Sequence, residues 1–213
     1  MRRHTRLALV PDIPGLRLHV ADDVAHVGQA VTVELGLPDA DLPYWAFAWA
    51  GGLAIARYLV EHPGEVSGLR VVDVASGSGL CAIAALRAGA GSVRAFDVDP
   101  LAEAAVAVNA RANAVRVGFG RRDPLDEPPP PCDVLLAGDV CYQEAMAARM
   151  LAWLRLAADG GTRVLLGDPG RPYLPGGLER LATFRVRTST ELEDAEVKES
   201  AVYTFPVGPG TSI

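Results

Sequence analysis

Cysteine is scarce in this chain of 213 residues. Cys81, Cys132 and Cys141 are the only three, and they lie far apart in the sequence. This number and spacing give neither a disulfide framework nor a cysteine-based metal site. We therefore expect no metal ion at the functional site.

Long hydrophobic runs are also missing. No apolar stretch reaches the ~18 residues that predict a membrane-spanning helix. The N-terminus begins with basic residues, but its apolar part ends at Pro11, before it reaches the ~7–15 residues of a secretory signal core. We expect no membrane partner and a cytoplasmic location.

Clusters of positive charge are absent as well. The formal net charge is −6, and the arginines are scattered along the chain. Proteins that bind a nucleic-acid backbone usually carry a basic patch or stripe. The sequence therefore predicts no nucleic-acid partner, and it leaves the oligomeric state open.

The length and the 50% hydrophobic content suit one domain with a single core. Residues 1–42 are interpreted as an N-terminal extension and residues 43–213 as the main domain. Within the extension, Asp22 to Leu35 is predicted as a helix or as a mixed helix–strand segment. Turn-forming residues make the segment 38–43 a linker.

Apolar strands and alanine-rich helices alternate after residue 47. Strands that alternate with helices of ~10–15 residues predict βαβ units and a parallel sheet. The predicted helices are Phe47–Glu61, Gly79–Ala88, Pro100–Ala114, Tyr142–Ala157 and a short one at Leu174–Ala182. The predicted strands are Leu69–Val74, Ser92–Asp97, Val115–Gly120, Asp133–Gly138, Thr162–Gly167, Phe184–Glu191 and Ser200–Val207.

The last two strands are separated by a short acidic segment, Glu193 to Glu196. We expect them to pair as a hairpin and to add an antiparallel edge to the sheet. The predicted fold class is therefore α/β, a doubly wound and mostly parallel sheet with an antiparallel C-terminal hairpin.

Two carboxylates flank a glycine-rich turn at the end of the first βαβ strand. Asp73 precedes Gly77 and Gly79, and Asp97 ends the next strand. Ligands of open α/β sheets bind beyond the carboxyl ends of the strands, and glycine lets the backbone approach them closely. Two acids around such a turn suit a cationic cofactor with a free ribose, which indicates S-adenosylmethionine.

Each carboxylate has an expected role toward that cofactor. Asp73 acts on the ammonium, directly or through water, and Asp97 accepts hydrogen bonds from the ribose hydroxyls. The N-terminus of the following helix favours the cofactor carboxylate. A nicotinamide or flavin nucleotide, no cofactor at all, and a helix-capping role for Asp97 remain as alternatives.

Two further acids lie close to this site in the sequence. Asp99 precedes Pro100, so a helix N-cap is favoured over ligand contact. Asp123 follows the third strand, where its carboxylate is a candidate partner of the adenine amine. The alternative for Asp123 is a solvated loop acid.

Five segments together resemble the seven-β-strand class I methyltransferases, and within them the lysine methyltransferases that modify the β subunit of electron transfer flavoprotein. The resemblance covers residues from about Pro43 to Val207 in order and spacing. The glycine turn marks only the superfamily, whereas the tryptophan-rich segment and the last two segments are narrower. The five segments are 43–52 (PYWAFAWAGG), 73–79 (DVASGSG), 96–100 (FDVDP) with Asn109 and Asn113, 138–142 (GDVCY) and 167–171 (GDPGR).

The resemblance implies a seven-stranded, Rossmann-like methyltransferase fold. It also implies a set of residues that bind S-adenosylmethionine: Trp49, Asp73, Ala75, Gly77, Gly79, Asp97, Val98, Asn113, Asp123 and Gly138. Ala75 stands where the superfamily usually has glycine, so we expect a slight shift of the turn without loss of binding. For Trp49 the alternative is one buried helical face shared with Trp45.

Asp139 and Tyr142 match the acid-x-x-Tyr motif of these lysine methyltransferases and are the implied catalytic residues. Asp139 is expected to hold the incoming lysine amine and Tyr142 to line the transfer channel. A carboxylate raises the pKa of a nearby ammonium, so Asp139 orients the amine rather than acting as a strong base. Asp139→Ala is expected to abolish transfer and to leave cofactor binding largely intact. The alternative for Asp139 is a helix N-cap.

Two other residues of these segments are less specific. Cys141 occupies a position where an aromatic residue is commoner, and we interpret it as packing rather than as a nucleophile. Arg171 is expected to bridge to an acid, either Asp139 or Asp168.

The resemblance implies a protein-lysine N-methyltransferase that uses S-adenosylmethionine, with the β subunit of electron transfer flavoprotein as the expected protein substrate. The alternatives are a methyltransferase for another protein, such as a ribosomal protein, or for a small amine. A non-catalytic binding module that keeps the fold is a third possibility, but the intact motif acids argue against it.

Overall fold

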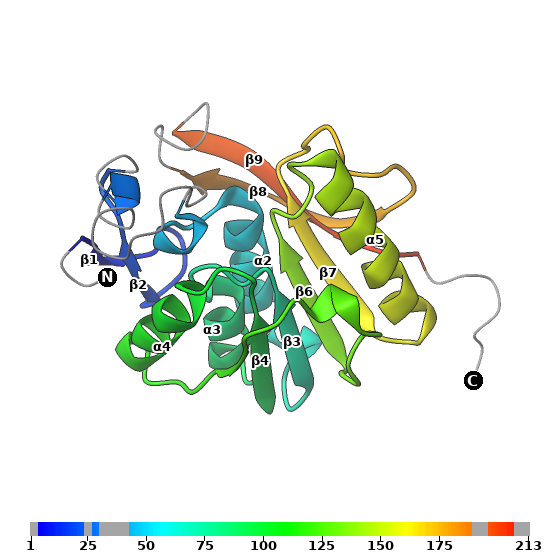
Figure 1. Ribbon diagram of the computed structural model, residues 1–213, viewed down its shortest axis with the longest axis horizontal. Coiled ribbons are helices and arrows are strands. Elements are labelled where there is room, and N and C mark those ends of the chain that lie inside the picture. Colours follow the sequence, from blue (N-terminus) through cyan, green and yellow to red (C-terminus); the bar gives the residue numbers. More distant parts are fainter. Residues whose placement is uncertain (1–3, 24–26, 30–42, 189–195, 207–213) are drawn as a thin grey trace.

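Two β-sheets organise the computed structural model, which describes residues 4–23, 27–29, 43–188 and 196–206. The larger sheet has seven strands in the order β5-β4-β3-β6-β7-β9-β8 (Figure 1). Its strands are β3 (Arg70–Val74), β4 (Ser92–Phe96), β5 (Gly118–Gly120), β6 (Val134–Gly138), β7 (Arg163–Asp168), β8 (Glu179–Arg187) and β9 (Val197–Thr204). The strands from β3 to β7 are parallel, and β9 pairs antiparallel with both β7 and β8. The predicted fold class, including the C-terminal hairpin, is confirmed.

Four α-helices connect and cover these strands. They are α2 (Ala50–Glu61), α3 (Leu80–Arg87), α4 (Ala102–Ala112) and α5 (Glu144–Asp159). Short 3-10 helices are η1 (Tyr44–Ala46), η2 (Pro63–Glu65) and η3 (Pro124–Asp126). None of the helices in the described segments is both long enough and apolar enough to cross a membrane.

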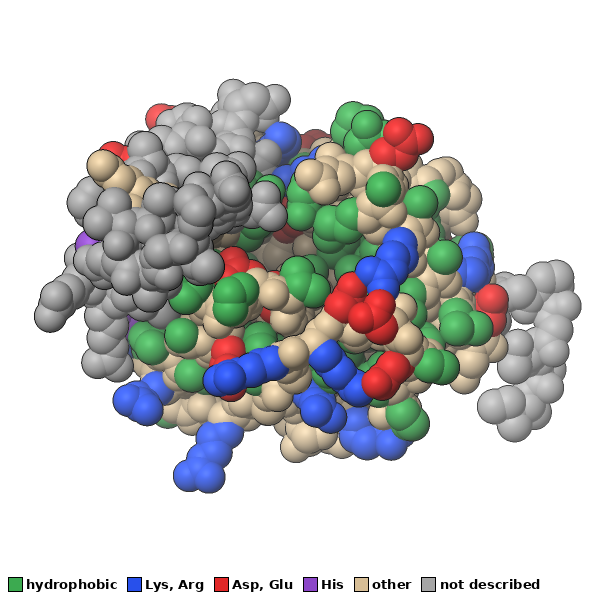
Figure 2. Space-filling view, viewed as in Figure 1, with side chains coloured by type: hydrophobic (Ala, Val, Ile, Leu, Met, Phe, Trp, Pro, Cys, Tyr) green, Lys and Arg blue, Asp and Glu red, His purple; other side chains and the backbone are tan. Residues whose placement is uncertain are grey.

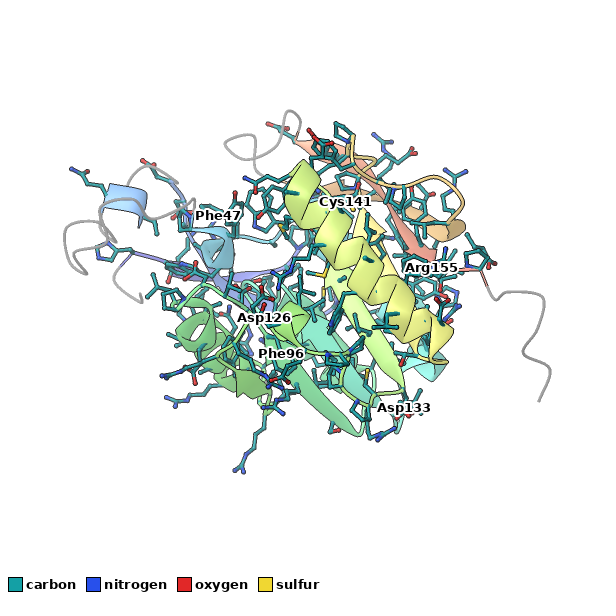
Figure 3. All side chains as sticks on the ribbon, turned by 45° about the vertical axis from the view of Figure 1, so that its right-hand side comes forward. Phe47, Phe96, Asp126, Asp133, Cys141 and Arg155 are labelled. Atoms are coloured by element: carbon teal, nitrogen blue, oxygen red, sulfur yellow. The ribbon has the colours of Figure 1, made fainter. Side chains whose placement is uncertain are left out.

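Buried side chains on either face of the sheet form separate cores. Alternate residues of β3 and β6 belong to different clusters, because successive side chains of a strand point to opposite faces. Val71 and Leu136 pack with α2 and α3, whereas Val72 and Leu135 pack with α5. Figure 3 labels Cys141, which follows β6, and Asp133, which precedes it. The carboxyl end of the sheet, where Cys141 lies, faces the expected site.

An antiparallel hairpin precedes the main sheet. It consists of β1 (Arg6–Leu9) and β2 (Arg17–Val20), and Leu18 on β2 is buried in the same core as α2 and α3. The side-chain amide of Asn113, at the end of α4, donates to the carbonyl of Arg17 and accepts from its N–H. The prediction of a helix or mixed segment at Asp22–Leu35 lies mostly outside the described residues.

One predicted element is wrong. Leu174–Ala182 was expected as a short helix, but β8 begins at Glu179 and pairs with β9 along its length. The positive φ of Gly177 (+80°) marks the turn that leads into β8. Hairpin pairing with β9 overrides the helical tendency of the leucine- and alanine-containing sequence.

Candidate active site

A cavity of about 1100 Å³ lies over the carboxyl ends of β3, β4 and β6. Figure 2 shows that this face is hollowed near its centre, with hydrophobic and acidic side chains around the hollow. Ten of the twelve expected site residues line the cavity: Trp49, Asp73, Ala75, Gly77, Asp97, Val98, Asp123, Gly138, Asp139 and Tyr142. The fold therefore brings together residues that are almost a hundred positions apart in the sequence.

The glycine turn has a left-handed backbone at three positions. The φ angles are +52° at Ala75, +48° at Gly77 and +78° at Gly79. Ala75, the departure from the usual glycine, thus adopts a conformation that is strained for any residue with a Cβ. Gly79 ends the turn, and a Cβ there would lie 3.0 Å from Cγ2 of Val106 on α4.

Asp73 lies under this turn and is 1% exposed. One of its carboxylate oxygens accepts a hydrogen bond from the Ala82 N–H (3.0 Å). Burial raises the pKa of Asp73 to about 8, and the negative charge of Asp97 contributes in the same direction. A buried carboxylate without a cationic partner among the described residues is well suited to a cationic ligand.

Ser76 provides an independent test of the expected cofactor. Its hydroxyl is buried in the cavity lining and has no hydrogen-bond partner among the described residues. Buried polar groups are normally paired, so an orphaned hydroxyl indicates a missing polar partner. Together with Asp73 and the cavity volume, it fits a polar, cationic molecule such as S-adenosylmethionine.

Asp97 follows β4 and is tied to the glycine turn. Its carboxylate accepts hydrogen bonds from the N–H of Gly77 (2.7 Å) and from the N–H of Asp99 (2.9 Å). Burial raises the pKa of Asp97, and these two bonds oppose the rise. The Asp99 carboxylate accepts from the Leu101 N–H at the start of α4, which is the capping role expected for it. The ribose contact of Asp97 stays a prediction.

Asp123 caps η3 through a hydrogen bond from the Leu125 N–H (2.9 Å). It also forms an ion pair with Arg149 of α5 (2.6 Å), which pairs with Asp126 as well. Arg149 therefore connects two walls of the cavity. The contact of Asp123 with an adenine amine stays a prediction.

Gly79 and Asn113 are not among the lining residues. The side chain of Asn113 bonds to Arg17 on β2, to the Asn109 carbonyl and to Arg87 on α3. In this structure it holds the N-terminal hairpin against α4. The expectation that Asn113 contacts the cofactor has no support from this geometry.

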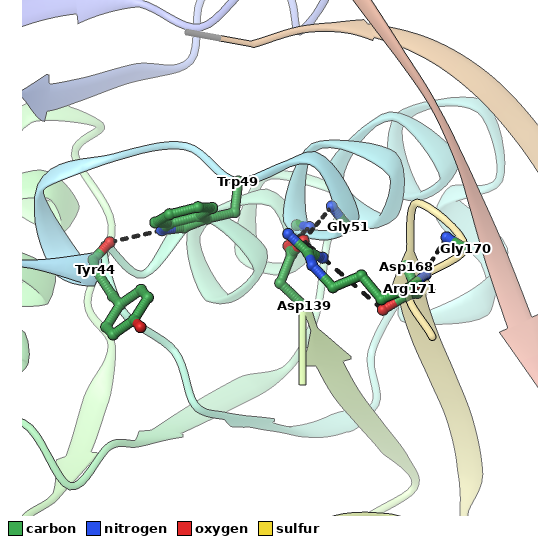
Figure 4. A network of polar contacts seen from close by, with 8 residues as sticks. Tyr44, Trp49, Gly51, Asp139, Asp168, Gly170 and Arg171 are labelled. Carbon is green, nitrogen blue, oxygen red and sulfur yellow. Dashed lines mark hydrogen bonds and ion pairs between the residues drawn. The ribbon is translucent and has the colours of Figure 1, made fainter. Parts of the chain in front are cut away.

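An aromatic group closes one side of the cavity. The Trp49 indole N–H donates to the Tyr44 carbonyl (3.0 Å; Figure 4). The ring of Tyr44 lies 5.4 Å from that of Trp49 and 5.5 Å from that of Tyr142. Trp45 lies in η1, whereas Trp49 precedes α2, so the alternative of one shared helical face is wrong. Tyr44 is a lining residue that the sequence analysis did not select.

The Asp139 carboxylate caps a helix, but not α5, the helix that follows it in the sequence. Oδ1 accepts from the N–H of Gly51 (2.9 Å) and Oδ2 from the N–H of Gly52 (2.8 Å), so Asp139 caps the N-terminus of α2. The helix that follows Asp139, α5, begins after Gln143 without a side-chain cap. Asp139 thus caps a helix, as the alternative interpretation held. The helix is α2, more than 80 residues earlier, and not the helix that follows Asp139.

Gly51, Gly138 and Gly167 allow this close approach of α2 to the sheet. A Cβ on Gly51 would lie 2.2 Å from the Gly167 carbonyl oxygen, and a Cβ on Gly138 would lie 3.0 Å from Gly52. Side chains at these positions would separate the N–H groups of α2 from Asp139. These glycines lie in the segments that resemble the methyltransferase family, but their contacts cannot be inferred from the sequence.

Arg171 and Asp168 complete the group around Asp139 (Figure 4). The Arg171 guanidinium lies 2.6 Å from Asp139 Oδ1 and 3.8 Å from Asp168 Oδ2. Asp168 Oδ1 accepts from the N–H groups of Gly170 and Arg171, both at 2.7 Å. The two alternatives for Arg171 thus both hold, with Asp139 as the closer partner.

Cys141 is fully buried among the side chains that pack with α5. Burial raises its pKa to about 12. A thiol in this state is a poor nucleophile, in agreement with the packing role expected for it.

Comparison with known proteins identifies related sequences over most of the chain. The electron transfer flavoprotein beta subunit lysine methyltransferase of Rattus norvegicus is 37% identical over 170 residues, which cover 76% of this chain and 67% of that protein. The protein of the same name from Xenopus laevis is 35% identical over 170 residues, covering 76% and 69%. The family model for ribosomal protein L11 methyltransferase (PrmA) matches residues 59–138.

Solved structures share the fold. Magnesium protoporphyrin IX methyltransferase from Synechocystis PCC 6803 with bound SAH has a TM-score of 0.54 and 16% sequence identity. The match covers 86% of this chain and all of that chain (100%). From the extent of the sequence match and this fold, the chain belongs to the family of electron transfer flavoprotein beta subunit lysine methyltransferases, class I enzymes that depend on S-adenosylmethionine.

Proposed function

We propose that this protein methylates lysine side chains on the β subunit of electron transfer flavoprotein. The observation that carries the proposal is the 37% identity with a lysine methyltransferase of that name, over a region that includes both the cofactor acids and Asp139. S-adenosylmethionine, when bound, supplies a methyl group on a positively charged sulfur. Such a methyl needs little activation, so the protein mainly orients the acceptor.

Each part of the cavity has a task in this proposal. Asp73 and Asp97 hold the cationic and ribose ends of the cofactor, and the aromatic group of Tyr44, Trp49 and Tyr142 keeps water out. Among the described residues, Asp139 Oδ1 accepts from Gly51 and Arg171, whereas Oδ2 accepts from Gly52 alone. A carboxylate has about four acceptor positions. One position on Asp139 is thus left for the target amine.

Labelled methyl transfer tests the substrate. Wild-type enzyme with labelled S-adenosylmethionine is expected to label the β subunit of purified electron transfer flavoprotein, on a lysine Nζ identified by peptide mass spectrometry. Ribosomal protein L11 serves as the parallel acceptor, because the L11 methyltransferase model matches residues 59–138. Label on L11 and none on the flavoprotein, from enzyme shown by calorimetry to bind the cofactor, would replace the proposed substrate.

Asp139→Ala is expected to reduce transfer by at least about 100-fold, because the amine loses its orienting acceptor. The structure does not support the expectation that this variant binds the cofactor as well as the wild type does. The substitution also removes the cap of α2 and leaves the buried Arg171 without its closest partner, which costs about 3–5 kcal/mol. Thermal unfolding is expected to show this loss, with weaker cofactor binding as a result.

The double variant Asp139→Ala/Arg171→Met separates the two effects. Removing both charges is expected to recover part of the stability, because Arg171 is no longer left without its closest partner, while Asp168 keeps its hydrogen bonds from the N–H groups of residues 170 and 171. Transfer is expected to stay low. Recovery of transfer in the double variant would show that Asp139 does not orient the amine.

A further inference from the structure

The segment Asp168-Pro169-Gly170-Arg171 is built as a turn that directs one cation toward Asp139. The Asp168 carboxylate binds the N–H groups of Gly170 and Arg171, and Gly170 has a φ of +87°. This arrangement returns the Arg171 side chain to the cavity, where it is 16% exposed and contacts Asp139. The turn therefore fixes where the guanidinium lies.

Charge around Asp139 is unbalanced without Arg171. The neighbouring carboxylate is the buried Asp168 on β7, and the charged partner in contact with Asp139 is Arg171. Arginine stays protonated throughout the working pH range, so it provides a permanent positive charge.

A target lysine must lose its proton before it accepts a methyl group. Its reference pKa is ~10.4, and a bare carboxylate beside it would raise this value further. The same carboxylate is useful as a hydrogen-bond acceptor only if it is ionised. The site must therefore hold an ionised carboxylate without stabilising an ammonium.

We propose that Arg171 is a positioning residue for methyl transfer, whose guanidinium neutralises Asp139 so that the open acceptor position of Asp139 holds the target lysine as a neutral amine. The inference rests on the proposed role of Asp139 toward lysine. Asp168 acts one step further out, by fixing the turn that aims Arg171. The Asp-Pro-Gly-Arg segment thus gains a role in the reaction rather than in the fold alone.

Other titratable groups lie in the cavity or close to Asp139. Cys81 on α3 and Cys141 after β6 have pKa values raised by burial, so both thiols stay neutral. Asp73 has a pKa of about 8 and titrates in the working range. Rates are therefore compared at saturating S-adenosylmethionine, where the contribution of Asp73 is the same in all variants. Tyr44 and Tyr142 line the same cavity.

The first experiment is the pH dependence of kcat for Arg171→Met. Without the guanidinium, either the target amine or Asp139 keeps a proton to higher pH. A protonated amine cannot accept the methyl group and a protonated Asp139 cannot hold the amine, so activity falls at low pH in both cases. We expect the acid limb of the profile to move by about one to two pH units toward alkaline pH, because an opposite charge in contact with a carboxylate lowers its pKa by roughly 1–3 units. Arg171→Lys, which keeps the charge, is expected to restore most of the wild-type profile.

Arg163→Met is the matched control. Arg163 begins β7, at the end of the strand away from the turn that carries Arg171, and pairs with Glu65 (3.2 Å). Its loss removes a partly buried ion pair but no charge from the cavity. An unshifted profile in Arg171→Met, or an equal shift in Arg163→Met, would overturn the proposal.

A second measurement needs no methyl acceptor. An infrared pH titration of the cofactor-bound enzyme follows the protonated carboxyl band of Asp139, assigned with Asp139→Asn. The pKa of Asp139 is expected to be higher in Arg171→Met than in the wild type, and equal values would overturn the proposal. Failure of the flavoprotein as a substrate leaves this result unaffected, so the two proposals fail separately.

Discussion

Asp73→Asn is expected to make the cofactor-free protein more stable above pH 8. The pKa of Asp73 is about 8 in the fold, against an ordinary value of 3.8. Between these values the folded chain binds a proton that the unfolded chain does not, so stability falls as pH rises through this window. The cost is complete above pH 8 and reaches up to about 5 kcal/mol.

Asparagine carries no charge at any pH, so the variant avoids this cost while keeping an acceptor for the Ala82 N–H. Urea unfolding at pH 4.5 and pH 8.5 is the measurement. The two proteins are expected to be nearly equal at the lower pH and to diverge at the higher one. Lower stability of the variant at pH 8.5 would mean that Asp73 is already ionised with a partner.

The same substitution is expected to weaken S-adenosylmethionine binding by about 30- to 100-fold, since a buried charge-assisted hydrogen bond is worth about 2–3 kcal/mol. Binding of the cationic cofactor to the wild type should ionise Asp73 and release about one proton at pH 7. Calorimetry in buffers with different ionisation enthalpies measures that proton. Asp73→Asn should release none.

Asp133→Asn is a matched control for both measurements. Asp133 precedes β6 at the far end of the sheet, and hydrogen bonds from Arg70 lower its pKa to about 2. Folding lowers the pKa of Asp133, whereas it raises the pKa of Asp73. Replacing Asp133 should therefore reduce stability at neutral pH rather than increase it. Cofactor affinity should be unchanged.

Gly51→Ala is expected to have a large structural effect for a single added methyl group. The added Cβ would lie 2.2 Å from the Gly167 carbonyl oxygen and 2.8 Å from Asp139 Oδ2. Both α2 and β7 are held by backbone contacts at this point, so neither can move without breaking the cap from Asp139. We expect a loss of more than about 3 kcal/mol, at or beyond the usual upper end for overpacking.

Gly52→Ala is the control on the next residue of the same helix. Its Cβ would meet the Cys81 sulfur and a Leu80 methyl at 3.6 Å, which is ordinary contact. Alanine in a helix is favoured over glycine by about 1 kcal/mol, so this variant should be unchanged or slightly more stable. Thermal unfolding of both variants is the measurement, and equal Tm values would contradict the close contact of α2 with β7.

The sheet was predictable because it follows from local patterns. Alternating strands and helices, with an acid or glycine after each strand, predict both the topology and the edge at which the site lies. The N-terminal hairpin was missed, although the turn-forming segment from Pro11 to Gly15 separates β1 from β2. Its backbone is bound by the side chains of Asn109 and Asn113, 90 or more residues away, which local patterns cannot reveal.

The residues of the site could be predicted from the sequence more readily than the contacts between them. Asp73, Asp97 and Asp139 could be selected because each follows or ends a strand. That Asp139 binds the N–H groups of Gly51 and Gly52 depends on α2 crossing the ends of β6 and β7, which is a tertiary contact. For the same reason, the sequence left open whether Arg171 reaches Asp139 or Asp168.

The strand order has a consequence for how the chain is made. β7 is covered on one side by β6, but its other neighbour is β9, the last strand in the sequence. During synthesis, the edge of β7 at Leu166, Gly167 and Asp168 therefore stays open until Val197–Thr204 has left the ribosome. Open strand edges pair readily with other chains. A chain interrupted shortly before β9 should aggregate even though the whole cofactor cavity has already been translated.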